Sequence, residues 1–468
     1  MDRIPSHRFT ARATPRSGRT VNPHAGRTVS PGGADPSLYS LSPRAIWAFI
    51  RTQKASFWFV CIYLFLEYVR PQQIYTAILG PPYAQIAIIL ASAAFLIEQR
   101  KVRLGLPELL VMFFSLVVIL SSVNAFDSQL SYDRFWRYFS WVVIYVLIAN
   151  TIDNERRFLV FMLSFLLYSF KMAQFGTRSW ASSGFAFRSW GTTGSPGWFQ
   201  NSGEFGIQMC IFLPLIVTFI LALGDRWPKW VRLTAWLAAG LAVTSIVGSA
   251  SRGALIGLGG LVLWGLIASR KKGRTLLAVV ALAGLVYLIL PAEQKVRLEA
   301  MGEDNTSISR TTMWKNGLEM MRDNPVLGIG YENWQKYSTL RYGGTGLQVH
   351  NTFVQAGSEL GYTGLIAFIA LIVCTFVINR RTRKLVGLHP QSGRFMFYMA
   401  HGLDGALVGF IVSGFFISVL YYPFFWINLA MTVGLHNAAR DAFPAMKVAL
   451  STRASPGQGN VHSTASAS

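Results

Sequence analysis

The sequence has few cysteines and few acidic residues. Its three cysteines, Cys61, Cys210 and Cys374, all lie in apolar stretches, without a CxxC pair or a histidine partner. This argues against a disulfide scaffold and gives no indication of a metal site. Asp and Glu total 21 against 43 Lys and Arg. The basic residues are dispersed along the chain and not gathered in one domain, so nucleic-acid binding is not indicated either.

Several other patterns are missing. The segments expected outside the membrane contain no GxGxxG and no GxxxxGK, so a nucleotide site is not indicated there, and we expect no cofactor. No alternating strands of about ten residues occur, which argues against a β-barrel. No cleavable signal peptide is visible, so the first apolar segments are expected to direct insertion into a membrane.

What the sequence does contain is long apolar runs. Half of the residues are hydrophobic, 14% are charged, and the mean hydropathy is +0.37. We therefore predict an all-α polytopic membrane protein with about twelve transmembrane helices. The expected spans lie near residues 55–69, 74–97, 105–124, 134–152, 156–175, 203–223, 232–249, 253–268, 275–291, 352–378, 397–419 and 421–438.

The distribution of Lys and Arg predicts the orientation. Basic clusters alternate along the chain with loops that lack them, as the positive-inside rule requires. Loop 126–133, expected outside, has no Lys or Arg until Arg134 at its edge. Both termini are then cytoplasmic. The clusters expected on the cytoplasmic side lie at 99–103, 155–157, 226–232, 270–274 and 380–384.

The two ends of the chain have a different composition. Residues 1–43 are rich in Arg, Ser, Thr, Pro and Gly, and we expect a disordered cytoplasmic tail. An organelle transit peptide is the alternative, although Pro and Gly interrupt any amphipathic helix there. Residues 44–438 would form the transmembrane domain, and residues 439–468 a second cytoplasmic tail.

Two expected outer loops are long enough to carry function. Loop 176–202 mixes Trp, Phe and Arg with Gly and Ser, which suits a folded lid at the membrane surface. Loop 291–350, between the ninth and tenth spans, is long enough for a small helical subdomain. There, residues 306–309 could cap a helix that ends at Asn324-Pro325. Its apolar stripe more often means packing than a substrate groove. The stripe comprises Met313, Trp314, Leu318 and Met321.

In this topology only one histidine, His350, lies on the outer face, together with Arg188, Arg252 and Arg310. His350 could simply cap or bond the start of the next helix, but at a pKa of about 6.5 it would be largely neutral at pH 7, as a general base requires. Arg252 lies between two apolar spans and needs a carboxylate, a lipid headgroup or a substrate phosphate as partner. Arg310 is expected to open a helix, where it could share an anion with the free N–H groups. Arg188 could be no more than a solvated loop residue.

The motifs at these positions resemble the bacterial O-antigen ligase and O-antigen polymerase superfamily. The resemblance is strong from about Asn201 to Val377, and most resembles O-antigen ligase. It rests on the order of four sequence motifs, which are Ser251-Arg252-Gly253, Arg310 to Trp314, Asn324 to Gly330, and His350-Asn351 followed by Glu359 to Gly364.

The resemblance implies a glycosyltransferase of the bacterial inner membrane with its active site facing the periplasm. Its donor would be a glycan on undecaprenyl pyrophosphate, and its acceptor the sugar of lipid A–core. Arg252 and Arg310 match the residues thought to hold the pyrophosphate, and His350 matches the residue thought to activate the acceptor hydroxyl. Arg188 is a further candidate for binding the pyrophosphate. No metal is required, and displacement in one step would invert the anomeric carbon.

Two alternatives remain. A repeat-unit polymerase or a protein O-oligosaccharyltransferase of the same superfamily would use the same donor, because acceptor choice depends on loop shape. A transporter of lipid-linked glycans would also have about twelve spans. However, the two halves of this sequence do not repeat, and its polar residues gather at one face, which does not favour transport.

Overall fold

The computed structural model describes residues 36–75, 80–186, 191–269, 271–289, 305–344 and 346–443. All regular structure in these residues is helical, and none is a β-strand. The α-helices are α1 (Pro36–Tyr39), α2 (Pro43–Arg51), α3 (Ala55–Tyr68), α4 (Pro71–Ile74), α5 (Tyr83–Ile97), α6 (Leu106–Val123), α7 (Ser128–Thr151), α8 (Glu155–Ser182), α9 (Ser202–Leu223), α10 (Lys229–Gly248), α11 (Arg252–Ala268), α12 (Lys272–Ile289), α14 (Asn305–Asp323), α15 (Trp334–Tyr342), α16 (Thr352–Gly387), α17 (Arg394–Gly414) and α18 (Pro423–Ala442).

Each expected span overlaps a helix, and six of the described helices are long and apolar enough to cross a membrane. These six lie at Leu106–Val123, Glu155–Ser182, Ser202–Arg226, Lys229–Gly248, Thr352–Gly387 and Arg394–Gly414. Helices α5 and α11 are apolar but shorter. The all-helical membrane fold is thus confirmed for the described residues, and the plan of about twelve spans stays a prediction.

Five of the described helices begin where a short polar side chain accepts a hydrogen bond from a free backbone N–H. The side chain of Asp127 accepts from Leu130 N at the start of α7, and that of Asn154 from Arg157 N at the start of α8. Asn201, Ser251 and Asn351 do the same for α9, α11 and α16. The loops therefore carry clear helix-start signals, although the apolar runs themselves are uniform.

Helices α9 and α17 pack closely in the interior, where most of their residues are buried. Small residues allow the approach: a Cβ added to Gly409 would lie 3.0 Å from the backbone oxygen of Cys210. Close packing of this kind holds helices together in a bilayer, where apolar surface alone provides no driving force.

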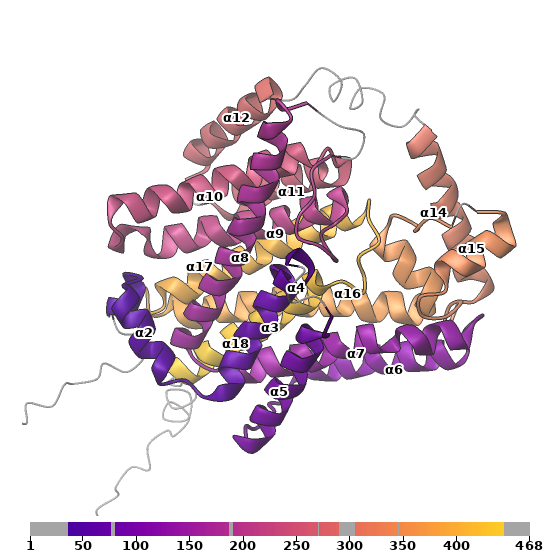
Figure 1. Ribbon diagram of the computed structural model, residues 1–468, viewed down its shortest axis with the longest axis horizontal. Coiled ribbons are helices and arrows are strands. Elements are labelled where there is room, and N and C mark those ends of the chain that lie inside the picture. Colours follow the sequence, from indigo (N-terminus) through magenta and orange to yellow (C-terminus); the bar gives the residue numbers. More distant parts are fainter. Residues whose placement is uncertain are drawn as a thin grey trace, which may run out of the picture.

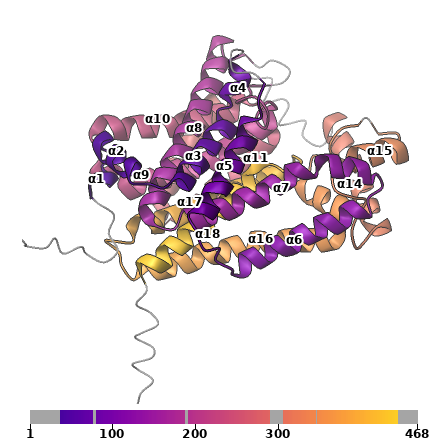
Figure 2. The ribbon, with the colours of Figure 1, turned by 60° about the horizontal axis from the view of Figure 1, so that its bottom comes forward.

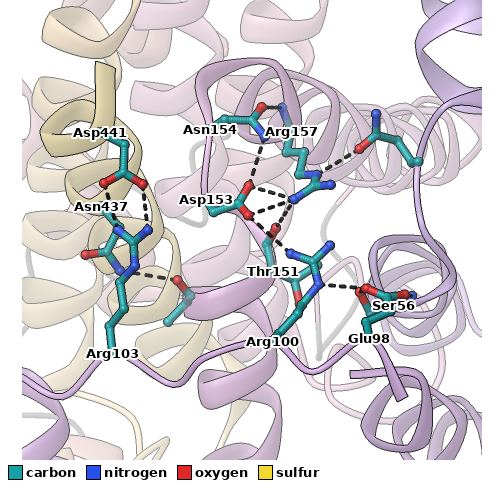
Figure 3. Close-up of polar contacts among 12 residues, drawn as sticks. Ser56, Glu98, Arg100, Arg103, Thr151, Asp153, Asn154, Arg157, Asn437 and Asp441 are labelled. Atoms are coloured by element: carbon teal, nitrogen blue, oxygen red, sulfur yellow. Dashed lines mark hydrogen bonds and ion pairs between the residues drawn. The ribbon is translucent and has the colours of Figure 1, made fainter. Parts of the chain in front are cut away.

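Three loops expected on the cytoplasmic side adjoin at one end of the bundle (Figure 3). Arg100 follows α5, Asp153 and Arg157 flank the start of α8, and Asp441 ends α18. Their ion pairs are Arg100–Glu98 at 2.8 Å, Arg100–Asp153 at 3.2 Å, Arg157–Asp153 at 2.7 Å and Arg103–Asp441 at 2.6 Å. Segments far apart in the sequence thus share the end that the charge pattern assigned to them.

Helices α14 and α15 lie at the opposite end of the molecule from α1 and α2 (Figures 1 and 2). They form a small helical unit beside the ends of α6, α7 and α16. A small apolar core of Met320, Ile329, Trp334 and Val349 holds it together. The described part of the expected outer loop 291–350 therefore contains the expected helices.

The ends of three segments differ from the expectation. Residues 36–43 are not a disordered tail: Leu38 is buried, the hydroxyl of Tyr39 bonds the Glu155 carboxylate, and Trp227 Nε1 donates to Tyr39 O. Helix α8 continues to Ser182, into the expected loop 176–202. Helix α18 continues to Ala442, past the expected start of the second tail. Residues 1–35 and 444–468 lie outside the described residues.

Candidate functional site

His350 lies two residues before Thr352, the first residue of α16, and has a left-handed backbone, with φ of 52°. The helix is capped by the next residue, because the side chain of Asn351 accepts from Phe353 N at 2.9 Å and Val354 N at 3.1 Å. His350 is therefore not the capping residue. Histidine is among the side chains that tolerate this backbone region, which is strained for most others. Its imidazole is half-buried.

Two tryptophans hold the backbone that leads to His350. Trp314 Nε1 donates to Val349 O, and Trp334 Nε1 donates to Leu347 O, each at 3.1 Å. Trp334 N in turn donates to the buried carboxylate of Glu359 at 3.2 Å. The chain before His350 is thus fastened to both helices of the outer unit.

Arg310 lies close enough to His350 to act on its protonation. Burial, and then the charge of Arg310, lower the pKa of His350 from 6.5 to about 4. The imidazole is therefore neutral at pH 7, and protonation needs much more acid than the ordinary pKa suggests. The sequence predicted the neutral form but not this size of shift, because burial is a tertiary property.

The expected position of Arg310 at the start of a helix is wrong. Helix α14 begins by Asn305, so Arg310 lies in its second turn, and its end at Asp323 agrees with the prediction. The expected cap at 306–309 is part of the helix. The free N–H groups of the first turn therefore do not lie beside the Arg310 backbone. An anion bound by the Arg310 guanidinium would not share those N–H groups at its position.

Arg252 is the first residue of α11, and the hydroxyl of Ser251 before it caps the helix. The next residue, Gly253, packs so closely on Phe416 that an added Cβ would lie 2.9 Å from Phe416 Cβ. The ring of Phe416 lies 6.3 Å from that of Trp314, centroid to centroid. A continuous set of contacts therefore links the start of α11 with the tryptophan that holds the chain before His350.

Arg188 lies outside the described residues. The described part of the loop resumes after it at Gly191 and Thr192. Thr192 N donates to Gly248 O at 2.9 Å, and a Cβ on Gly191 would lie 2.1 Å from Ser249 O. The loop that carries Arg188 thus returns to the bundle beside the turn that precedes Arg252.

The outer unit is joined to α16 through backbone contacts. Ile329 N donates to Ser358 O at 2.9 Å, and Gly330 N donates to Glu359 O at 3.0 Å. Gly361 has φ of 71° and breaks the helix into two parts. A Cβ on Gly361 would lie 2.5 Å from Val326 O. Glycine is required at this position both by the backbone conformation and by the close approach.

Sequence reasoning missed a second polar cluster at the same end of the bundle. Glu332 pairs with Arg134 at 2.7 Å and with Arg137 at 3.3 Å. Arg137 and Arg70 both lie over the ring of Trp198, at 5.8 Å and 5.7 Å from its centroid. The only signal in the sequence was the position of Arg134 at the edge of an otherwise base-free loop. Nothing local connects it with Glu332 or Trp198.

The described residues contain no group of three or more His, Cys, Asp or Glu side chains that could hold a metal ion. What they bring together at this end is a neutral imidazole beside a guanidinium, with a second guanidinium at the neighbouring helix start. Such groups can bind an anion and accept a proton.

The family comparison matches this part of the chain. Residues 237–369 match the model of the O-antigen ligase family. This range contains Arg252, Arg310 and His350. This segment of the chain is therefore similar to the O-antigen ligase family.

Two relatives have similar sequences. The exopolysaccharide production protein ExoQ of Rhizobium meliloti is 28% identical over 204 residues, which are 40% of this chain and 47% of the relative. The O-antigen ligase of Pseudomonas aeruginosa is 26% identical over 160 residues, which are 34% of this chain and 38% of the relative. The similarity thus spans less than half the length of either relative.

Proposed function

We propose that this protein transfers a glycan from undecaprenyl pyrophosphate to an acceptor hydroxyl at the periplasmic face of the bacterial inner membrane. The observation that carries the proposal is the pairing of a neutral His350 with Arg310 at one end of the bundle. His350 is the general base. Arg252, Arg310 and Arg188 bind the donor pyrophosphate.

The chemistry balances without a further reactant. The acceptor oxygen attacks the anomeric carbon of the donor, and its proton passes to the imidazole of His350. The bond between that carbon and the pyrophosphate oxygen breaks, and the leaving group takes the electron pair. Guanidinium groups stabilise the charge that develops there through bidentate hydrogen bonds. Attack from the face opposite the leaving group inverts the anomeric carbon.

The position of Arg310 makes the base dependent on the donor. In the empty site its charge opposes protonation of His350. A pyrophosphate bound to Arg310 offsets that charge, so the imidazole becomes a better proton acceptor when the donor is present. His350 therefore takes the proton of the acceptor hydroxyl more readily when the donor is bound than when the site is empty.

For the acceptor we propose the sugar of lipid A–core, and the similarity to a relative named O-antigen ligase supports this choice. The second candidate is a repeat-unit polymerase, which the relative named exopolysaccharide production protein favours. Both functions use the same donor site. They differ in what binds over the outer unit of α14 and α15.

A transfer assay tests the proposal. Purified full-length protein receives an undecaprenyl-pyrophosphate glycan with lipid A–core, free lipid-linked repeat units and a peptide as parallel acceptors. Product on lipid A–core supports ligation, and a lengthened lipid-linked glycan supports polymerisation. Product on the peptide would favour a protein O-oligosaccharyltransferase. If no acceptor is glycosylated while the protein moves the donor across a vesicle membrane, the transfer proposal is wrong.

The lowered pKa of His350 predicts an acid-tolerant enzyme. Because the neutral imidazole is the active form, kcat/KM should stay level from pH 7 to about 5 and fall as the pH approaches about 4. Arg310→Gln removes the weaker of the two causes of the shift, so the acid limb should move to higher pH but stay below 6.5. A pH profile of the residual activity measures this. An unchanged acid limb in the variant would contradict the electrostatic contact.

Trp314→Phe tests whether the indole N–H positions the general base. The ring is retained, but Val349 O loses its hydrogen bond, which is worth about 1 kcal/mol. We expect kcat to fall roughly tenfold with little change in the donor KM. Trp230→Phe is the matched control, because Trp230 is 70% exposed on α10. Equal loss in both variants would show a general effect of removing a tryptophan.

A further inference from the structure

Asn333 links the outer unit of α14 and α15 to the connection between α6 and α7. It is fully buried and lies directly before α15. Its Oδ1 accepts from Asp127 N at 2.8 Å, and its Nδ2 donates to Asp127 O at 3.2 Å, Ser131 Oγ at 2.8 Å and Tyr331 O at 3.0 Å. The orientation of the amide follows from its partners, because a backbone N–H can only donate. Both polar atoms of this side chain are therefore hydrogen-bonded.

The Asn333 side chain does not cap its own helix. An asparagine before a helix commonly accepts from a free N–H of the first turn, but this one makes no such bond to α15. The first residue of α15, Trp334, instead donates its backbone N–H to the buried carboxylate of Glu359 in α16 at 3.2 Å. A carboxylate also interacts favourably with the positive end of the helix dipole. The start of α15 is thus fixed by contacts with two other parts of the chain.

Further contacts hold the outer unit on the same side of the bundle. The connection between α6 and α7 lies beside α15 in both views (Figures 1 and 2). Phe126 N donates to Ile329 O at 2.9 Å, and the hydroxyl of Tyr331 donates to Arg134 O at 3.2 Å. Ser131 Oγ donates to Tyr331 O at 2.7 Å. On this side the outer unit is therefore a fixed part of the bundle and not a hinged lid.

Trp334 connects this frame with the candidate base. Its indole Nε1 donates to Leu347 O at 3.1 Å, three residues before His350. His350 has φ of 52°, and such a backbone conformation persists where the surrounding structure holds it. The backbone that leads to His350 therefore depends on where the start of α15 is held.

We propose that Asn333 and Glu359 are positioning residues that place the imidazole of His350 through Trp334. The proposal rests on the proposed function, in which His350 is the general base. Neither side chain is expected to touch substrate, because both are buried and each bonds the segment that carries Trp334. Their loss should displace the base without removing it.

Asn333→Ala tests the positioning role by kinetics. It should lower kcat by about tenfold to a hundredfold, the cost of a misplaced catalytic group, and change the donor KM by less than about twofold. The acid limb of kcat/KM should also move to higher pH, toward 6.5. The reason is that burial is the larger cause of the lowered pKa of His350, before the charge of Arg310, and a displaced imidazole is less buried. Loss of folded protein would instead lower the activity by the same factor at every pH.

Two further variants complete this test. Ser131→Ala removes one of the three acceptors of Asn333 Nδ2, and kcat should fall about two- to fivefold with a smaller shift of the acid limb. If Asn333→Ala does not fold, Ser131→Ala decides by the same measurements. Asn124→Ala is the matched control, because Asn124 is exposed in the same connection and its amide donates to Leu120 O within α6. Its kcat and acid limb should not change.

Glu359→Gln separates positioning from acid–base chemistry. Glutamine keeps an oxygen that can accept from Trp334 N, so kcat should stay within about threefold of that of the unaltered protein. Glu359→Ala removes the acceptor and should behave like Asn333→Ala. An equally large loss in Glu359→Gln and Glu359→Ala would overturn the positioning role of Glu359, because the charge and not the hydrogen bond would then be required.

An NMR titration of His350 tests its placement without glycan transfer. Full-length protein with ¹³C-labelled histidine is studied in nanodiscs of neutral lipid, and the His350→Asn variant identifies the signal. The pKa of His350 should be about 4 in the unaltered protein and closer to 6.5 in Asn333→Ala. The same pKa in both proteins, or equal losses of kcat in Asn333→Ala and Asn124→Ala, would overturn the proposal. The expected shift without any transfer by the unaltered protein would support the placement and count against the proposed function alone.

Discussion

Replacing His350 with asparagine is expected to lower kcat for glycan transfer by about 10²–10⁴, the usual contribution of a general base. Asparagine tolerates the left-handed backbone found at this position, where φ is 52°. It cannot take up the acceptor proton at neutral pH. The cap at Asn351 and both tryptophan hydrogen bonds remain in place, so the loss should appear in kcat without loss of folded protein.

The measurement is single-turnover transfer by purified protein, with expression and thermal unfolding as checks on folding. His389→Asn is the matched control, because His389 is an exposed histidine in the connection between α16 and α17. Activity of the His350→Asn variant within a few-fold of the unaltered protein would remove the general-base role.

Arg252 is expected to show an almost equally large effect, including with a conservative change. Arg252→Ala should lower kcat/KM by about 10²–10³, as for loss of one preorganised donor to a developing charge. Arg252→Lys should recover only a small part of this, because an ammonium group cannot form the two parallel hydrogen bonds of a guanidinium. If Arg252 acted only through its positive charge, the lysine variant would instead recover most of the activity.

Arg232→Lys provides the control for the same chemical change, because Arg232 is an exposed residue near the start of α10, away from the candidate site. Donor binding and transfer should be measured separately. If Arg252→Lys transfers at the rate of the unaltered protein, bidentate recognition of the pyrophosphate at this position is wrong.

The helical fold was predictable because long apolar segments in a bilayer have few alternatives to a helix. Every expected span overlaps a helix for this reason. The ends of the segments were less predictable. Leu38 and Tyr39 lie in a stretch of polar composition, yet they pack on helices far away in the sequence. Their burial depends on contacts that composition does not encode.

For the candidate site, the sequence predicted which residues to consider but not all of their contacts. Loop topology predicted His350 and Arg310 on one face, and burial together with the charge of Arg310 lowers the pKa of His350. The predicted start of α14 was wrong because the polar residues before Arg310 can be part of a helix as well as cap one. The pairing of Glu332 with Arg134 and Arg137 joins residues that are 198 and 195 positions apart. No local pattern predicts a contact at that separation.

The backbone junction between the outer unit and α16 determines which piece of this protein can be exchanged as a whole. Gly361 fits against the backbone of Val326, and Gly330 donates its N–H to Glu359 O and fits against Ala125 in the connection between α6 and α7, so none of these surfaces can change alone. A chimera that imports the outer helices of a relative must therefore also import about the first three turns of α16. The piece that can be exchanged is therefore residues 305–362 together with the contacting residues 125–131, and it carries Arg310 and His350 together into any new scaffold.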